Sequence, residues 1–218
     1  MKLAIFDMDG TLIDSQALIV GAMVTAFERL SITVPTRAQI LSIVGLSLPQ
    51  AMDRLSPAGV GPDDIVALTD AYRDAFVALR AETGGEAATP LYPGAREALD
   101  GLGALGWQMG VATGKAMRGV DHAFAAHDLA QYFTTVQTAD GHPSKPHPSM
   151  VQTALAESGV AAENAVMIGD TTFDIDMGRA AGVRTIGVSW GYHPVADLRD
   201  AGASHIITHF NQLVPLLT

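Results

Sequence analysis

The sequence predicts an α/β protein in which a parallel sheet carries an inserted, all-helical segment. From residue 92 onward, short apolar runs alternate with helical patterns, which is typical of a parallel sheet covered by helices on both faces. No convincing strand occurs between residues 15 and 88, where the apolar residues follow helical spacing instead. We therefore expect residues 1–14 and 89–218 to form the sheet-containing domain and residues 15–88 to form a separate helical domain.

The helical segment shows clear start and stop signals. Apolar residues from Leu18 to Leu30 recur on one helix face. Thr36 and Gln39 have the spacing of a capping box, which predicts a short helix that ends near Gly45. Two further helices are expected over 49–55 and 65–79. Gly84-Gly85, followed by Pro90, is the expected hinge through which the chain returns to the sheet.

The sheet-containing part begins with the buried strand Leu3–Phe6, which stops where polar residues and a glycine follow. The later strands are expected over 108–112, 133–137, 165–168, 185–188 and 205–207, separated by helices over 95–105, 117–127, 149–158, 174–181 and 196–200. Ligands of parallel sheets bind outside the carboxyl ends of the strands. Polar motifs that directly follow a strand are therefore the candidate functional residues.

Composition narrows the function classes. The formal net charge of −10 and the isoelectric point near 4.9 oppose bulk electrostatic binding to nucleic acids or anionic membranes. The absence of cysteine removes disulfides, thiolate metal sites and cysteine nucleophiles. No stretch approaches the roughly 18 apolar residues of a membrane span. Asp7 and Asp9 interrupt any signal-peptide core, so we expect a cytoplasmic protein.

The first strand runs directly into Asp7-x-Asp9-Gly10-Thr11-Leu12-x-Asp14. Two acids this close repel each other in a desolvated crevice unless a cation or a shared proton intervenes. Their hard oxygen ligands suit Mg²⁺, which completes its coordination with water and substrate phosphate. The alternative is an ordinary strand end that carries two solvated acids.

Three further motifs follow later strands. Thr113-Gly114-Lys115 offers a hydroxyl and free backbone amides that could hold a phosphate oxygen, unless Thr113 merely caps the next helix. Lys145 is one of only three lysines and precedes Pro146, although it could be an ordinary surface lysine. Asp170 and Asp174 are four residues apart, which on a helix would direct both carboxylates to one point.

In this order, the four motifs resemble those of the haloacid dehalogenase-like phosphohydrolase superfamily, and the insertion resembles the helical cap of its phosphoglycolate phosphatase-like subgroup. The resemblance extends over essentially the whole chain and implies a Rossmann-like core. It also implies an Mg²⁺-dependent phosphatase that acts on a small phosphorylated metabolite, such as phosphoglycolate or a sugar phosphate.

By this resemblance, Asp7 is the nucleophile that forms an aspartyl-phosphate, and Asp9 is the general acid and base. Asp7, Asp170 and the backbone carbonyl of Asp9 would bind the metal, with Asp174 as an outer ligand or a partner behind the ligands. The residues expected to hold the phosphate are Asp9, Gly10, Thr113, Gly114 and Lys145, of which Thr113 and Lys145 are also expected to act in catalysis.

Other chemistries are weighed by the same resemblance. The segment between Asp14 and Pro90 has no lysine for a Schiff base and no histidine of the kind found in related phosphomutases, while Asp9 is the acid that haloacid dehalogenases lack. A phosphomutase, another chemistry of this superfamily and a non-catalytic phosphate-binding relative remain the alternatives. The sequence does not reveal which of Ser47, Gln50 and Arg54 faces the site, nor the oligomeric state.

One further motif would indicate a serine hydrolase instead of a phosphatase. Gly187-x-Ser189-x-Gly191 matches the nucleophile elbow of serine hydrolases and follows a strand. Too little chain remains after Gly191, however, to return an acid and a histidine from separate later strands over the serine. We therefore do not expect serine-hydrolase chemistry.

Overall fold

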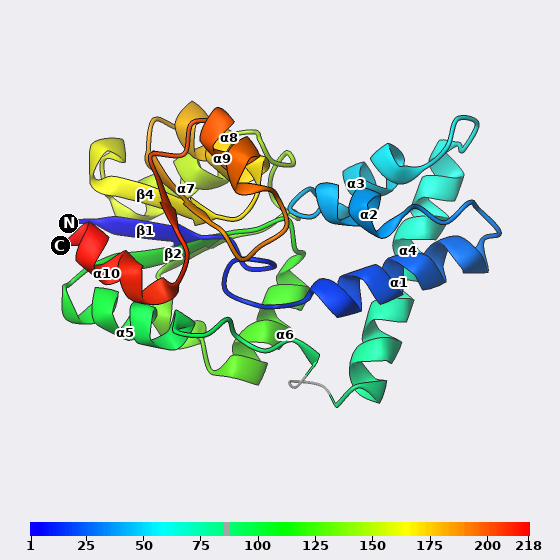
Figure 1. Ribbon diagram of the computed structural model, residues 1–218, viewed down its shortest axis with the longest axis horizontal. Coiled ribbons are helices and arrows are strands. Elements are labelled where there is room, and N and C mark those ends of the chain that lie inside the picture. Colours follow the sequence, from blue (N-terminus) through cyan, green and yellow to red (C-terminus); the bar gives the residue numbers. More distant parts are fainter. Residues whose placement is uncertain (85–87) are drawn as a thin grey trace.

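The computed structural model describes residues 1–84 and 88–218, so Gly85 of the expected hinge lies outside the described residues. Six strands form one sheet in the order β3-β2-β1-β4-β5-β6, and every neighbouring pair is parallel (Figure 1). The strands are β1 (Leu3–Phe6), β2 (Gln108–Ala112), β3 (Thr135–Gln137), β4 (Ala165–Gly169), β5 (Arg184–Val188) and β6 (His205–Ile207). The predicted α/β fold with a parallel, Rossmann-like sheet is confirmed.

Helices cover both faces of the sheet, because alternate strand residues point to opposite sides. Ala4 and Phe6 of β1 belong to one apolar cluster, and Leu3 and Ile5 belong to the other. The first cluster includes residues of α5, α6 and α10, and the second includes residues of α7 and α8. These helices and the remaining one of this part are α5 (Ala95–Ala104), α6 (Met117–His127), α7 (Ser149–Ser158), α8 (Thr172–Ala180), α9 (Val195–Asp200) and α10 (Leu213–Leu217).

Four of the five described α-helices between β1 and β2 form what we call the helical unit. It lies to one side of the sheet, and α1 packs along α4 (Figure 1). It has its own apolar cluster, which includes Met23, Phe27, Ile40, Met52 and Leu68. The capping box of Thr36 and Gln39 is present, as predicted. The helices are α1 (Gln16–Arg29), α2 (Arg37–Ser42), α3 (Leu48–Leu55) and α4 (Pro62–Glu82).

The two connections to the helical unit run side by side. Ile13 and Leu91 form an antiparallel bridge. The Asp14 N–H donates to the Pro90 carbonyl at 2.8 Å, and the Tyr92 N–H donates to the Leu12 carbonyl at 2.9 Å. The helical unit therefore joins the sheet at a single place, just beyond the carboxyl end of β1.

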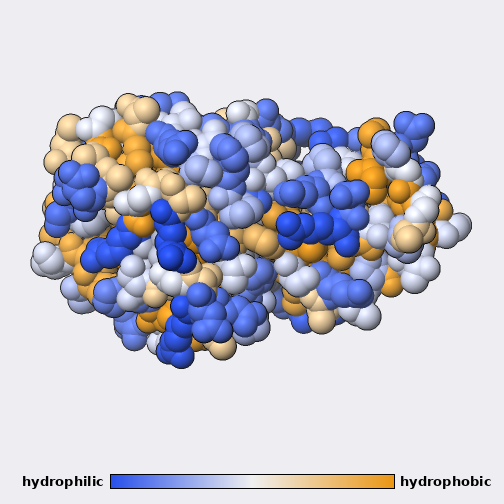
Figure 2. All heavy atoms as spheres, turned by 90° about the horizontal axis from the view of Figure 1, so that it is seen from above, coloured by the Kyte–Doolittle hydropathy of each residue, from blue (hydrophilic) through white to orange (hydrophobic). Residues whose placement is uncertain are grey.

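Several expected elements differ at their ends: the helix expected over 65–79, for example, is α4 (Pro62–Glu82), and two of the differences have a local cause. The strand expected over 133–137 is limited to β3, because a 3₁₀ turn at 130–132 precedes it. The helix expected from residue 174 begins at Thr172, because Thr171 caps it. In the part of the chain that the structure describes, no helix is long and apolar enough to cross a membrane. Hydrophilic residues, interspersed with apolar patches, cover much of the face seen in Figure 2.

Candidate active site

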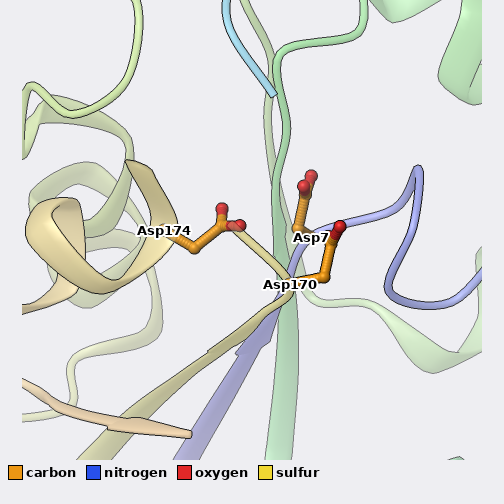
Figure 3. Close-up of side chains that lie close together, drawn as sticks. All are labelled: Asp7, Asp170 and Asp174. Atoms are coloured by element: carbon orange, nitrogen blue, oxygen red, sulfur yellow. The ribbon is translucent and has the colours of Figure 1, made fainter. Parts of the chain in front are cut away.

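Three buried carboxylates meet at the carboxyl ends of β1 and β4. Asp7 follows β1, Asp170 follows β4, and Asp174 lies in the first turn of α8 (Figure 3). One oxygen from each lies within 4.8 Å of the others. We call Asp7, Asp170 and Asp174 the acidic cluster. The sequence predicted that these three acids would lie together, and the parallel sheet is what brings them to one edge.

Asp174 reaches the acidic cluster in a different way from the one that its spacing from Asp170 predicted. Four-residue helical spacing does not apply, because Asp170 precedes α8, which begins at Thr172. Asp174 instead closes the capping box of Thr171: its Oδ2 accepts from the Thr171 N–H at 3.0 Å and from the Thr171 hydroxyl at 2.7 Å. One Asp174 oxygen is thus already used by the start of its own helix.

Asp170 is held by two donors from distant segments. Its Oδ1 accepts from the Thr11 hydroxyl at 2.8 Å, and its Oδ2 accepts from the Tyr192 N–H at 2.8 Å. Gly10 allows this packing, since its φ is +85° and a Cβ there would meet Asp170 Oδ2 and the Tyr192 ring. The glycine of the first motif therefore has a geometric reason at this position.

Lys145 is completely buried between two members of the acidic cluster. Its Nζ lies 2.9 Å from Asp7 Oδ1 and 2.6 Å from Asp174 Oδ1. Burial alone would lower the pKa of Lys145, but the carboxylates of Asp174 and Asp7 raise it above its ordinary value. Lys145 is therefore a buried ammonium ion, and the interpretation as an ordinary surface lysine is wrong.

The acidic cluster carries more negative charge than Lys145 can balance. Burial raises the pKa of Asp7 to about 7 against the opposing effect of Lys145, and burial with the neighbouring carboxylates raises the pKa of Asp170 well above its ordinary value. Neither Asp7 oxygen receives a well-directed hydrogen bond from the described residues, despite the nearby ammonium group. An all-oxygen donor set with excess negative charge and unsatisfied oxygens fits a hard divalent cation such as Mg²⁺.

Asp9 faces different surroundings from Asp7. Its Oδ1 accepts from the Ser15 hydroxyl at 2.7 Å, and its Oδ2 lies 2.9 Å from Lys115 Nζ. The Tyr192 hydroxyl lies 3.1 Å from Ser15 Oγ and so supports this arrangement from the other side. The Asp9 side chain is not part of the acidic cluster. The expectation that Asp9 contributes its backbone carbonyl to a metal stays a prediction.

The motif after β2 lies against the helical unit. Thr113 is buried, and its Oγ1 accepts from the Lys115 N–H at 3.2 Å. It does not cap α6, whose N-cap residue is Ala116. A Cβ on Gly114 would meet the carbonyl oxygens of Gly45 and Leu46, the latter at 2.6 Å. Gly114 thus allows the loop after α2 to approach the sheet edge.

Two more contacts join the helical unit to the sheet edge. The Ser47 N–H donates to the Ser144 hydroxyl at 2.8 Å, next to Lys145. The His193 ring lies between the Thr172 N–H, 3.1 Å from Nδ1, and the Ser42 carbonyl, 3.2 Å from Nε2. Through these contacts the helical unit approaches the loops that follow β2, β3 and β5.

Several residues around Asp9 were missed by the sequence reasoning. A pocket of about 190 Å³ lies beside Asp9, and its lining includes Phe76 and Arg80 of α4 together with Lys115. The four-residue spacing of Phe76 and Arg80 was the available signal that they share a helix face. Ser47, Gln50 and Arg54, the candidates named from the sequence, do not line this pocket.

The segment that matched a nucleophile elbow supports the acidic cluster. A Cβ on Gly191 would meet the Asp170 side chain, and the next residue, Tyr192, donates its N–H to Asp170. Among the described residues, no hydrogen bond joins the Ser189 side chain to a histidine. The close approach to Asp170 gives Gly191 a role without serine chemistry.

Comparison with known proteins agrees with this geometry. A probable phosphatase, IndB, from Dickeya dadantii is 35% identical over 97% of this chain and 91% of its own length. A phosphoglycolate phosphatase from Nitrosococcus oceani is 28% identical over 100% of this chain and 96% of its own length. The crystal structure of a hydrolase from Pseudomonas syringae, 23% identical, superposes with a TM-score of 0.87 and covers 100% of this chain and 98% of that one.

The family model of the haloacid dehalogenase-like hydrolases matches residues 4–188, which include all four polar motifs and the helical unit. Together with the acidic cluster at the carboxyl ends of a parallel sheet, this match establishes the family. The chain belongs to the haloacid dehalogenase-like hydrolases.

Proposed function

We propose that this phosphatase hydrolyses a small phosphate monoester through an aspartyl-phosphate on Asp7, with Mg²⁺ bound at the acidic cluster. The observation that carries the proposal is the different surroundings of two acids only two residues apart. Asp7 lies in the acidic cluster with unsatisfied oxygens, whereas Asp9 faces a pocket. Such a division suits one carboxylate that attacks and one that transfers protons.

Asp7 and Asp170 would hold the metal, together with the backbone carbonyl of Asp9. Asp174 would act mainly by positioning Lys145, because its Oδ1 is paired with Lys145 and its Oδ2 with Thr171. The bound cation would supply positive charge that offsets the repulsion between the buried acids and the phosphate.

In the first step, an Asp7 oxygen attacks phosphorus, and the bond between phosphorus and the ester oxygen breaks. Asp9 donates a proton to that oxygen, so the oxygen carries no negative charge when the alcohol leaves. In the second step, Asp9 takes a proton from the water that attacks phosphorus. The bond from phosphorus to Asp7 then breaks, inorganic phosphate leaves, and both carboxylates return to their starting state.

The transferring oxygens need positive charge and hydrogen-bond donors, because phosphoryl transfer depends chiefly on positioning and charge neutralisation. Lys145 would supply the charge, and Thr113 with the backbone amide of Gly114 would supply donors. The Gly10 N–H already donates to the Ile13 carbonyl at 2.9 Å, so Gly10 would border the phosphate without supplying a donor. Gly114 also permits the close approach of the helical unit. Water would therefore be limited at the same place where the phosphate is held.

We further propose that residues 15–88 act as a cap domain over a core of residues 1–14 and 89–218. The paired connections at Ile13 and Leu91 would let the helical unit move relative to the sheet. Closure would leave room for the phosphate and a small organic group. We therefore expect a small phosphorylated metabolite to be a better substrate than a nucleic acid or a phosphoprotein.

Rate measurements with Mg²⁺ would test the proposal. The panel would contain 2-phosphoglycolate, sugar phosphates, nucleoside monophosphates, pyrophosphate and a phosphopeptide, each with and without EDTA. We expect small monoesters to be hydrolysed only with the metal. Preference for the phosphopeptide would contradict the closing cap, and full activity after exhaustive chelation would contradict the metal.

The nucleophile has its own test. Asp7→Asn keeps the side-chain shape but removes the attacking charge and one metal ligand, so turnover should fall to background while circular dichroism stays unchanged. Asp53→Asn, an exposed acid on α3, is the matched control and should keep its rate. An Asp7→Asn enzyme with a tenth of the starting rate would rule out the aspartyl-phosphate.

A further inference from the structure

The pocket beside Asp9 is formed jointly by the helical unit and the sheet-containing part. Phe76 and Arg80 come from α4, whereas Lys115 precedes α6 and His122 lies on it. The volume of about 190 Å³ is below the roughly 300–1,000 Å³ of pockets for drug-sized ligands. Only a small group could fill it, and under the proposed function its place beside Asp9 suits the leaving alcohol.

Lys115 is held in this pocket from three sides. Its Nζ lies 2.9 Å from Asp9 Oδ2 and 5.3 Å from the centre of the Phe76 ring. Its aliphatic stem runs along α6 at Gly119, where a Cβ would meet Lys115 Cγ at 2.6 Å. The ammonium group is therefore fixed between the proposed proton donor and the helical unit, with donors left for a further acceptor.

Arg80 brings a second cation to the same space. It is four residues after Phe76, so both side chains lie on the face of α4 that lines the pocket. Two other arginines of the helical unit, Arg29 and Arg73, pair with Asp74 and Asp70 respectively. No carboxylate of the described residues lies within 4.0 Å of the Arg80 guanidinium group. Among the residues that the structure describes, Arg80 is thus a half-buried cation without an acidic partner.

The charge balance of the pocket is opposite to that of the protein. The chain carries a formal net charge of −10, yet the described residues that line this pocket include two permanent cations and a histidine against the single carboxylate of Asp9. An arginine gains most from a carboxylate or a phosphate, because its planar fork matches two oxygens. Arg80 has no acidic partner among the described residues and lines the same pocket as Lys115, so an anionic ligand would be stabilised there.

We propose that Arg80 and Lys115 form a subsite for a second anionic group, a carboxylate or a phosphoryl group, on the leaving group of the substrate. The inference rests on the proposed function, because it takes the leaving oxygen to be at Asp9. It narrows the substrate to a small phosphate ester or anhydride whose leaving group bears a negative charge close to the bridging oxygen. The helical unit has no lysine, but it contributes the cation Arg80 to this subsite.

The test compares substrates that differ in that charge. 2-Phosphoglycolate carries the carboxylate, ethyl phosphate lacks it, and pyrophosphate has a phosphoryl leaving group. We expect kcat/KM of the unaltered protein to favour 2-phosphoglycolate or pyrophosphate over ethyl phosphate by at least about tenfold, as for one charge-assisted hydrogen bond. Arg80→Gln should remove most of this preference, and the matched variant Arg73→Gln on the same helix should retain it.

Binding separates this inference from the proposed chemistry. 3-Phosphonopropionate and propylphosphonate, which cannot be hydrolysed at phosphorus, would be titrated calorimetrically into the Mg²⁺-loaded protein. We expect the carboxylate-bearing ligand to bind at least about tenfold more tightly, and Arg80→Gln to remove the difference. If binding shows this selectivity but no ester is hydrolysed, the subsite stands and the proposed function fails.

The opposite results are equally clear. If 2-phosphoglycolate, pyrophosphate and ethyl phosphate are hydrolysed equally well, the proposed function stands and the subsite is wrong. If Arg80→Gln lowers kcat/KM for all substrates by the same factor, Arg80 only helps to hold the helical unit in place, and the subsite is again wrong. A preference for pyrophosphate that depends on Arg80 supports the subsite and identifies its group as phosphoryl.

Discussion

At the residue scale, the carboxylates of the acidic cluster repel one another. Asp7, Asp170 and Asp174 are buried, and the Lys145 ammonium group is paired with Asp7 and Asp174. Burial and the neighbouring carboxylates raise the pKa of Asp7 and of Asp170. Such a group of charges is costly to bury, and removing one member of a buried ion pair leaves the other uncompensated. Lys145 is therefore both the charge that a phosphate would contact and a condition for keeping the acids together.

Lys145→Ala should lower kcat by about 10²-fold or more, because one electrostatic donor to the transferring oxygens is lost. Lys145→Arg should restore only part of the rate, since the broader guanidinium fork does not fit the space between Asp7 and Asp174. The measurement is kcat and KM at saturating Mg²⁺, with Lys2→Ala, an exposed lysine, as control. An unchanged kcat with a raised KM would mean that Lys145 only attracts substrate.

At the scale of the elements, the loop after α2 contacts the loops at the carboxyl edge of the sheet. The carbonyl groups of Gly45 and Leu46 approach Gly114, and the Ser47 N–H binds the Ser144 hydroxyl. These loops precede or follow the residues that would hold the phosphate. Under the proposed function, closure of the helical unit and assembly of the phosphate site would therefore occur together.

Gly114→Ala tests this coupling. A Cβ there would meet the Leu46 carbonyl at 2.6 Å, so the helical unit should be displaced, with kcat/KM at least about tenfold lower. Gly103→Ala in α5 is the matched control, because its Cβ would meet nothing closer than 3.9 Å. Small-angle scattering should show a larger radius of gyration for Gly114→Ala alone. Unchanged kinetics and radius would show that the loop yields and that its approach does not matter.

At the scale of the whole molecule, the sheet-containing part and the helical unit each have their own apolar core, and charged residues lie where the two parts meet. The sheet-containing part has apolar clusters on both faces, and the helical unit has its own. The acidic cluster lies between them at the sheet edge, where its repulsion opposes folding when no cation is bound. Global stability should therefore depend on pH and on Mg²⁺ together.

The direction in which stability changes with pH follows from the pKa of Asp7, which burial raises from 3.8 to about 7. A raised carboxyl pKa favours the protonated folded state, so this contribution to the free energy of unfolding is full below about pH 4 and is lost as the pH rises through about 7. In EDTA, Tm should fall over this range. Mg²⁺ should raise Tm more at about pH 8 than at about pH 5, because protons compete with the metal for the carboxylates.

Differential scanning calorimetry at both pH values, with EDTA or Mg²⁺, measures this effect. Asp7→Asn cannot ionise at this position, so it should lose less stability with rising pH in EDTA and gain less from Mg²⁺. An increase in Tm with Mg²⁺ that is equal at the two pH values, or equal in Asp7→Asn, would show that the cation does not act at the acidic cluster.

Much of the architecture could be predicted from local sequence patterns. Strands such as 108–112 and helices such as 117–127 were correctly bounded, because burial on a regular element imposes a repeating apolar pattern. The gathering of Asp7, Asp170 and Lys145 could also be predicted. All parallel strands present their carboxyl ends at one edge, so residues just beyond them converge even when they are far apart in the sequence.

Other features depend on which side chains reach one another between separately folded parts. The amino-acid sequence by itself determined the elements, the parallel sheet and the acids at its edge. Only the tertiary structure decided that Lys115 pairs with Asp9 and that Arg80 lines the same pocket. The physical reason is that periodicity records whether a residue is buried, but not its partner. That partner is set by the docking of the helical unit on the sheet, which involves contacts between segments with no local signal in common.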